Sequence, residues 1–258
     1  MGLYGVLVEL DVFSEVSVSP QLIGPSSPTL PAPPPTTLLG ALAYPYLRKK
    51  KVSEVTYVNG KPCSPVVELI SKVHYASAGF YARTEQRVLE RVNQTLYLRR
   101  AHLDKLEMAW TVAQRGITIY ADDKLYLFYI VSDPRLIQYA WGITRVGRKE
   151  SIVVVRNVIV GLLEDLIAEE HEGLTIFYTP KNAAEWCEGA SEVRMNILDV
   201  DNLCKIETPK AGQFYIPDFD GMKCRASENG VFLRITDVQD PISNRPLMIL
   251  VPKDVIRC

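Results

Sequence analysis

Apolar residues take alternate positions from Tyr4 to Leu10, and this period of two predicts a first strand over residues 3–13. The segment that follows, 14–35, is dense in serine and proline and ends in Pro-Ala-Pro-Pro-Pro. Such a segment is stiff and extended, and its prolines lack the N–H groups that a central strand needs. We therefore expect a surface loop between the first strand and the next element.

A helix is predicted over residues 37–50, because apolar residues recur there every three or four positions. Thr36 and Thr37 can accept hydrogen bonds from the free N–H groups of its first turn. Gly40 inside the helix costs about 1 kcal/mol relative to alanine. Its presence indicates close packing against that face, by a sheet or by an RNA backbone.

Two further strand segments are predicted, one over 71–83 and one over 117–131. The pattern of the 117–131 segment is typical of two strands joined at Asp122 and Asp123. Between the two segments, residues 84–115 mix charged and amide side chains with few turn signals. This composition predicts an excursion from the sheet, either helical or a hairpin.

The pattern then predicts a second helix over 134–143, with Pro134 near its first turn, and a buried strand over the β-branched run 151–160. The element order becomes β-α-β-β-α-β. The fold class is therefore α+β: a ferredoxin-like (RRM-like) domain over 1–161, followed by a smaller β-rich domain over 162–258.

The last hundred residues carry weaker signals than the first part of the chain. An acidic, helix-like stretch follows Gly161. Short strand candidates come after it, at 174–178, 192–199, 230–237 and 247–251.

Charge changes this picture only locally. The 258 residues include 29 Lys and Arg against 30 Asp and Glu, a formal net charge of -1, so bulk basicity cannot attract nucleic acid. Basic residues do gather in places, and each group could bind RNA or be a solvated face; cations at the end of the first helix also complement its dipole. The candidates for RNA binding are Arg48, Lys49, Lys50, Arg87, Arg99, Arg100, Arg145, Arg148 and Lys149.

The cysteines stand at wide spacings with no C-x-x-C pair, which predicts neither a disulfide framework nor a zinc site. We expect them to be small buried apolar groups. The five are Cys63, Cys187, Cys204, Cys224 and Cys258. The sequence contains no secretory signal pattern and no run of eighteen apolar residues, so we expect a soluble cytoplasmic protein with no membrane partner.

Two segments are more specific than these patterns. Residues 33–44 read Pro-Pro-Pro-Thr-Thr-Leu-Leu-Gly-Ala-Leu-Ala-Tyr, and residues 145–151 read Arg-Val-Gly-Arg-Lys-Glu-Ser. Together they resemble the family-five Cas proteins of the RAMP superfamily, and the archaeal type I-A subunit is the variant most similar to this chain. The resemblance covers residues 1 to about 160 and leaves the last hundred unmatched.

The resemblance implies a role without catalysis, as a subunit of a type I-A Cascade surveillance complex. Such a subunit binds and caps the 5′ handle of the CRISPR RNA, and it contacts the large subunit and the neighbouring backbone subunit. The excursion over 84–115 matches the family's thumb by position. At Gly147, a glycine flanked by cations is expected to let backbone N–H groups approach phosphate.

Other functions are considered beside this one. RNA cleavage needs a proton donor or acceptor at the 2′-hydroxyl, and His102, which follows Arg99 and Arg100, is a better candidate than His74 or His171. The main alternative is therefore a metal-independent endoribonuclease acting on repeat RNA, and a generic RRM-like RNA binder is the third.

No metal, cofactor or small-molecule substrate is expected. The carboxylates that might suggest a calcium loop lack its central glycine and closing glutamate, and surface turns explain them better. They are Asp199, Asp201, Asp218 and Asp220. No phosphate-binding or dinucleotide-binding glycine motif occurs in the sequence.

Overall fold

The computed structural model describes residues 2–18, 29–53, 55–93, 110–120, 123–148, 150–204, 209–239 and 245–256. The chain is a mixed α/β protein built mostly of strands. Within these ranges no helix is long and apolar enough to cross a membrane.

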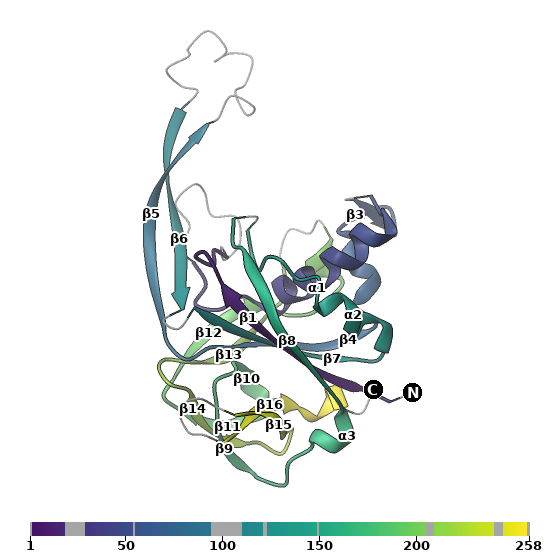
Figure 1. The fold of residues 1–258 in the computed structure, drawn as a ribbon, viewed down its shortest axis with the longest axis vertical. Coiled ribbons are helices and arrows are strands. Elements are labelled where there is room, and N and C mark those ends of the chain that lie inside the picture. Colours follow the sequence, from purple (N-terminus) through teal and green to yellow (C-terminus); the bar gives the residue numbers. More distant parts are fainter. Residues whose placement is uncertain are drawn as a thin grey trace.

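A four-stranded antiparallel sheet forms the centre of the molecule, in the order β4-β7-β1-β8 (Figure 1). The first strand, predicted over 3–13, is confirmed and occupies an inner position. The strands expected at 71–83 and 151–160 form the two edges. The bounds are β1 Tyr4–Val12, β4 Val73–Gly79, β7 Lys124–Val131 and β8 Val153–Leu162.

Each face of this sheet is covered by a different part of the chain. On one face Val6 and Val8 of β1 pack with Leu38 of the first helix in one hydrophobic cluster. On the other face Leu7 packs with Phe177 and other residues of the C-terminal half. The inner strand is therefore apolar on both faces, as its sequence requires.

The helix α1 (Pro35–Lys50) begins two residues earlier than predicted, and the expected capping by Thr36 and Thr37 is wrong. Pro34 takes the N-cap position, and no side chain caps the helix. The carbonyl of Pro34 accepts the N–H of Thr37 at 2.8 Å. Because Pro35 has no N–H and a fixed φ, it starts a helix without a side-chain cap.

No described atom would lie within 4 Å of a Cβ at Gly40, so close packing of a sheet there is wrong, and close approach of an RNA backbone stays a prediction. The close contact is instead at Gly142, where a Cβ would lie 2.6 Å from Cβ of Pro45 in α1. The second helix is shorter than the predicted 134–143. It consists of a 3-10 turn, η5 (Pro134–Leu136), and one α-helical turn, α2 (Ile137–Ala140).

The described ends of the segment 14–35, residues 14–18 and 29–35, are more buried than the surface loop that its composition suggests. Residues 31–35 are buried, and so is Ser17. The Tyr178 hydroxyl donates a hydrogen bond to the carbonyl of Pro33 at 3.1 Å. Prolines carry no N–H, so one tyrosine hydroxyl removes much of the polar cost of burying this segment.

The excursion over 84–115 is a hairpin, formed by β5 (Arg83–Asn93) and β6 (Trp110–Tyr120). It projects from the body at the end opposite the C-terminal strands (Figure 1). β6 and β7 also confirm two strands within 117–131, separated by a turn at Asp123, whose φ is +53°. We call this hairpin the thumb.

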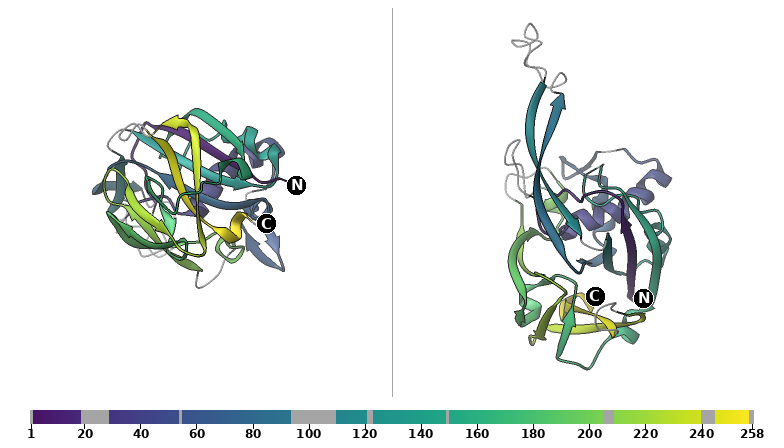
Figure 2. Two further views of the ribbon diagram at one scale, coloured as in Figure 1. Left: turned by 90° about the horizontal axis from the view of Figure 1, so that it is seen from below. Right: turned by 60° about the vertical axis from the view of Figure 1, so that its left-hand side comes forward.

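The C-terminal half is rich in short strands, arranged in sheets of order β10-β13-β12, β11-β14-β9 and β15-β16. The last two of these sheets lie at the end of the body away from the thumb, whereas β13 reaches the thumb root (Figures 1 and 2). The acidic, helix-like stretch expected after Gly161 contains one short helix, α3 (Leu163–Leu166). The division into domains at residue 161 stays a prediction.

Three of the predicted strands overlap observed ones: 192–199 with β12, 230–237 with β15 and 247–251 with β16. The fourth, predicted over 174–178, shares only residues 174–175 with β9. The strand bounds are β9 Glu172–Thr175, β10 Thr179–Pro180, β11 Ala184–Glu188, β12 Ala190–Asn196, β13 Ala211–Pro217, β14 Met222–Ala226, β15 Gly230–Gln239 and β16 Pro246–Pro252. A small hairpin that the sequence did not predict, β2 (Thr56–Val58) with β3 (Lys61–Cys63), follows α1.

Four of the cysteines form disulfides, which corrects the expectation of free thiols. Cys63 pairs with Cys204, and Cys187 on β11 pairs with Cys224 directly opposite on β14. The partners lie 141 and 37 residues apart in sequence, so spacing alone could not indicate them. Cys63 and Cys224 are buried, as predicted for small apolar groups.

Candidate nucleic-acid interface

The end of α1 carries cations over tyrosine rings. Tyr44 and Arg48 are four residues apart, so they share one face of the helix, and the guanidinium carbon lies 5.9 Å from the ring centroid. The same spacing places Nζ of Lys50 4.5 Å from the ring centroid of Tyr46. A cation held over an aromatic face is attracted by the ring quadrupole.

Residues from α2 and the loop after it join this group. The Arg145 guanidinium carbon lies 4.1 Å from the centroid of Tyr44, on the same ring that Arg48 approaches. Tyr139 meets Tyr46 edge to face at 5.3 Å, and Nζ of Lys49 lies 5.5 Å from the Tyr139 ring. We call this group the basic–aromatic cluster: Tyr44, Tyr46, Arg48, Lys49, Lys50, Tyr139 and Arg145.

Lys50 keeps its positive charge at neutral pH. Arg48, Lys49 and Lys50 are exposed. Hydrogen bonding to the Tyr46 hydroxyl raises the pKa of Lys50 above its ordinary value, and Glu68 lies 3.6 Å from the same ammonium group. The three cations also lie in the last turn of α1, where they complement the helix dipole, as expected from the sequence. Their binding to RNA stays a prediction.

The loop around Gly147 is shaped by its own chain. Gly147 has a φ of +96°, and a Cβ there would lie 2.8 Å from the carbonyl oxygen of Ser17. The Arg148 N–H donates to that oxygen at 3.2 Å, and the Val146 N–H donates to the carbonyl of Ser151 at 3.1 Å. These two N–H groups already have acceptors, so the glycine is explained by its approach to Ser17. The phosphate role of the exposed Arg148 side chain stays a prediction.

Ser17 connects this loop to the thumb. Its Oγ donates to the carbonyl of Gly116 on β6 at 2.8 Å, and its N–H donates to Oγ of Ser151 at 3.1 Å. Ser17 and Ser151 are completely buried. One residue of the proline-rich segment therefore fixes the thumb root and the Gly147 loop relative to each other.

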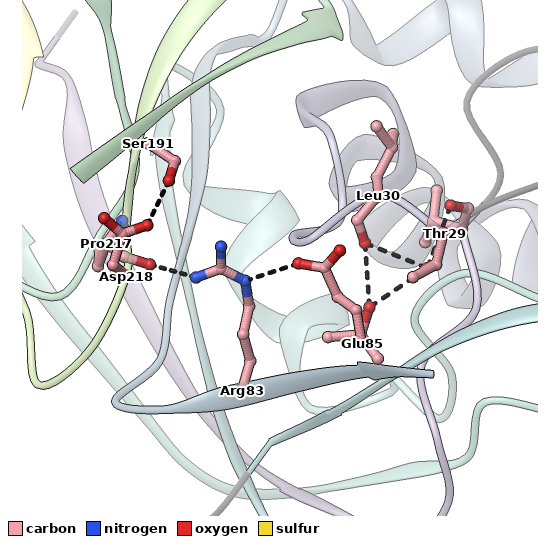
Figure 3. A network of polar contacts seen from close by, with 9 residues as sticks. Thr29, Leu30, Arg83, Glu85, Ser191, Pro217 and Asp218 are labelled. Atoms are coloured by element: carbon pink, nitrogen blue, oxygen red, sulfur yellow. Dashed lines mark hydrogen bonds and ion pairs between the residues drawn. The ribbon is translucent and has the colours of Figure 1, made fainter. Parts of the chain in front are cut away.

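The other strand of the thumb is fixed from the opposite side (Figure 3). Arg83, the first residue of β5, donates from Nη1 to the carbonyl of Pro217, and its Nε lies 3.3 Å from Oε1 of Glu85. Its guanidinium carbon also lies 5.4 Å from the ring centroid of Phe80. Both strands of the thumb are thus bonded to the body at their root.

Four predicted RNA contacts remain, and the structure describes one of them. Arg87 is exposed on the thumb, opposite Gly116 in the β5–β6 register. Three others, Arg99, Arg100 and Lys149, lie outside the described residues, as does His102.

Neither the other histidines nor the carboxylates form a metal site among the described residues. Burial lowers the pKa of His74. Asp199 and Asp201 each contact Nζ of Lys210, at 3.0 and 2.9 Å. These contacts agree with the interpretation of the aspartates as residues of surface turns.

The sequence analysis missed the tyrosines of the cluster, although their spacing contained a signal. Tyr44 and Tyr46 precede Arg48 and Lys50 by four residues, which is the spacing of neighbours on a helix. No comparable signal relates Arg145 to Tyr44, because only the folded chain brings them together.

Comparison with known proteins shows what this chain is similar to. No family model matches the sequence. Two curated proteins of Saccharolobus solfataricus do: the CRISPR system aCascade subunit Cas5 1 is 28% identical over 148 residues, 56% of this chain and 60% of that protein. CRISPR-associated protein Cas5 3 is 30% identical over 132 residues, 50% of this chain and 53% of that protein. The chain thus spans little more than half the length of the curated relatives it matches.

A solved structure covers more of the fold. A CRISPR protein from Archaeoglobus fulgidus aligns over 96% of this chain and 99% of its own, with a TM-score of 0.54 and 16% identity, which shows a shared fold. The chain is thus similar to CRISPR-associated proteins, and the curated relatives that it matches are Cas5 proteins. This Cas5-like sequence agrees with the resemblance of its two motifs.

Proposed function

We propose that this chain is a non-catalytic subunit of a Cascade-type surveillance complex and that it caps the 5′ handle of the CRISPR RNA with its basic–aromatic cluster. The observation that carries the proposal is the convergence of Arg48 and Arg145 on the Tyr44 ring. Single-stranded RNA is bound by cations that follow its phosphates and by aromatic rings on which its bases stack. The cluster offers its cations beside the half-buried rings of Tyr44 and Tyr139.

The order of the elements supports a ferredoxin-like fold. The order β1, α1, β4, β7, α2 and β8 follows the β-α-β-β-α-β pattern once the inserted hairpins are set aside. We therefore propose that the sheet of order β4-β7-β1-β8 is ferredoxin-like, as in RAMP proteins.

The proposed partners, besides the RNA handle, are the backbone subunit and the large subunit of the complex. One curated relative is named a subunit of aCascade. The thumb, which projects from the body, is the element we expect to reach the backbone subunit (Figure 1).

A binding role fits the protonation of the cluster better than a catalytic one. A general base works best when its pKa lies near the operating pH. A lysine that acts as a general base therefore needs a lowered pKa, but hydrogen bonding to Tyr46 raises the pKa of Lys50. Lys50 therefore remains a cation that can neutralise phosphate.

The test compares two double variants for binding to single-stranded 5′-handle RNA between 50 and 400 mM KCl, a range set by the salt sensitivity of phosphate contacts. Arg48→Gln with Arg145→Gln should reduce the slope of log affinity against log salt by about 1.4, because each phosphate contact in single strands contributes about 0.7. The matched control is Lys181→Gln with Arg225→Gln, two cations at 5.7 and 5.8 Å from ring centroids in the C-terminal half. Its slope should equal that of the wild type.

EDTA in every reaction separates the main alternative from this proposal. An unchanged slope in the Arg48 and Arg145 variant would refute the cluster as the RNA site. Cleavage of repeat RNA by the wild type in EDTA would instead support the metal-independent endoribonuclease.

A further inference from the structure

The central sheet has two edges, and the chain itself covers only one of them among the described residues. On the β4 edge, the N–H of Phe80 donates to the carbonyl of Ile176 at 3.2 Å. The N–H of Tyr178 donates to the carbonyl of Ala78 at 3.1 Å. The β8 edge is covered only at its start, where the Val153 N–H donates to Thr144 at 3.0 Å. The second half of β8 is the outermost strand beside β1 in the right view of Figure 2.

Register shows which backbone groups point away from the sheet there. The Leu163 N–H donates to the carbonyl of Leu3 at 2.9 Å, next to the pair Tyr4↔Leu162. In an antiparallel ladder, bonded and non-bonded pairs alternate. Leu162 and Val160 are therefore in non-bonded pairs, and their N–H and C=O groups face outward.

The side chains of these outward-facing residues are apolar and exposed. Val160 is 39% exposed and Leu162 is 40% exposed. Soluble proteins usually protect an open edge with lysine, proline or a bulge. The run from Val158 to Leu162 contains neither residue and no register shift, and the Val158 N–H is accepted by Oδ1 of Asn157 at 3.0 Å.

The charges near this edge indicate what covers it. Glu164 and Asp165 follow Leu162 and are exposed, so a phosphate backbone would be repelled there. The nearest cation along the strand, Arg156, is paired with Asp11 at 2.7 Å. A protein strand that is apolar beside Val160 and Leu162 and carries a basic residue beside Glu164 and Asp165 complements this surface, whereas RNA does not.

We propose that residues 158–162 of β8 pair with an extended segment of another protein, which adds a fifth strand to the sheet. The segment has apolar residues at alternate positions that cover Val160 and Leu162, and a lysine or arginine at its end next to Glu164 and Asp165. Addition of a strand to an open edge is a common mode of recognition between proteins. The proposal rests on the proposed function only in that the partner is sought in the assembled complex.

Residue-resolved hydrogen exchange tests the pairing in the wild-type protein. In the complex, co-purified with its genomic neighbours, the Val160 and Leu162 amides should exchange about tenfold more slowly than in the isolated chain, since each gains a hydrogen bond. The Ile159 and Gly161 amides, which face β1, serve as internal controls and should change little. Unchanged exchange at Val160 and Leu162 would overturn the proposal.

A variant pair tests the side chains. Val160→Lys with Leu162→Lys should weaken retention of one protein subunit by at least about tenfold, with handle RNA still bound. The matched control, Leu174→Lys with Val200→Lys, replaces residues that are 41% and 39% exposed elsewhere and should retain every subunit. Equal behaviour of the two variants would contradict the inference.

Two further outcomes also decide the question. In the isolated chain, the Val160 and Leu162 amides could exchange more slowly as the protein concentration is raised, and the particle could have the mass of a dimer. That result would show a second copy of this chain on the edge and refute a different partner. If no complex forms, the proposed function fails by itself, and a valine–threonine peptide with two terminal lysines then probes the edge. That peptide should slow the Val160 amide more than its counterpart with two glutamates, and equal effects would refute the charge argument.

Discussion

Replacement of Ser17 by alanine tests the connection between the thumb and the Gly147 loop. The change removes the donor to the carbonyl of Gly116, a bond of 2.8 Å between completely buried groups. A buried polar group left without its partner costs about 1–3 kcal/mol. Domains have a total stability of about 5–15 kcal/mol, so Ser17→Ala should lower the free energy of unfolding by a measurable fraction.

The assay is urea unfolding followed by tryptophan fluorescence, with Ser227→Ala as the control. Ser227 makes the same kind of bond, from Oγ to the carbonyl of Asn182 at 2.7 Å, but on the surface. Water can replace that bond, so the control should change stability by less than about 0.5 kcal/mol. Ser17→Ala should also speed exchange of the Arg148 amide, whose acceptor is the Ser17 carbonyl. Equal stability losses in the two variants would refute the reasoning.

Other predictions concern charge, covalent links and chemistry. Asp133→Asn should destabilise the protein by up to about 1 kcal/mol at pH 7, because asparagine can still cap η5 but loses the ion pairs with Arg135 and Lys72. Hydrogen bonds from Arg135 hold the pKa of Asp133 well below its usual range, so this stability is present above about pH 4 and is lost as pH falls further. In urea unfolding, the stabilities of variant and wild type should therefore approach each other as pH is lowered below about 4. Loss of the disulfide between Cys63 and Cys204 should lower the melting temperature more than loss of the other disulfide, because loop entropy gives upper estimates of about 5 and about 4 kcal/mol for separations of 141 and 37 residues. Complexes with His102→Ala should carry guide RNA of normal length on a gel; accumulation of unprocessed precursor by a folded, RNA-binding variant would instead locate cleavage in this chain.

Local patterns predicted the parts of the fold that depend on neighbouring residues. The period of two around Val6 specifies a strand wherever its apolar faces are buried. Apolar spacing identified α1, and mixed polar composition identified an excursion at 84–115, although it could not distinguish a hairpin from a helix. A two-stranded ribbon is defined by its pairing, and that information lies in contacts across the hairpin.

What the sequence could not predict depends on contacts between distant segments. The composition of 14–35 indicates a surface loop, but Ser17 is buried because Gly116 and Ser151 satisfy its polar groups. Likewise, Arg145 was recognised as a cation, while its position over Tyr44 follows from the packing of Gly142 against Pro45. In both cases the decisive partner is remote in sequence.

The disulfide between Cys63 and Cys204 also determines how the chain is connected. The residues between these cysteines form a covalent ring, and the whole thumb lies within it. A single backbone cut between β5 and β6 would open the polypeptide but leave its two fragments joined through the sulfur atoms. The cut protein would keep its full mass under non-reducing conditions and separate into two fragments after reduction. Connectivity of the body is therefore independent of an intact thumb.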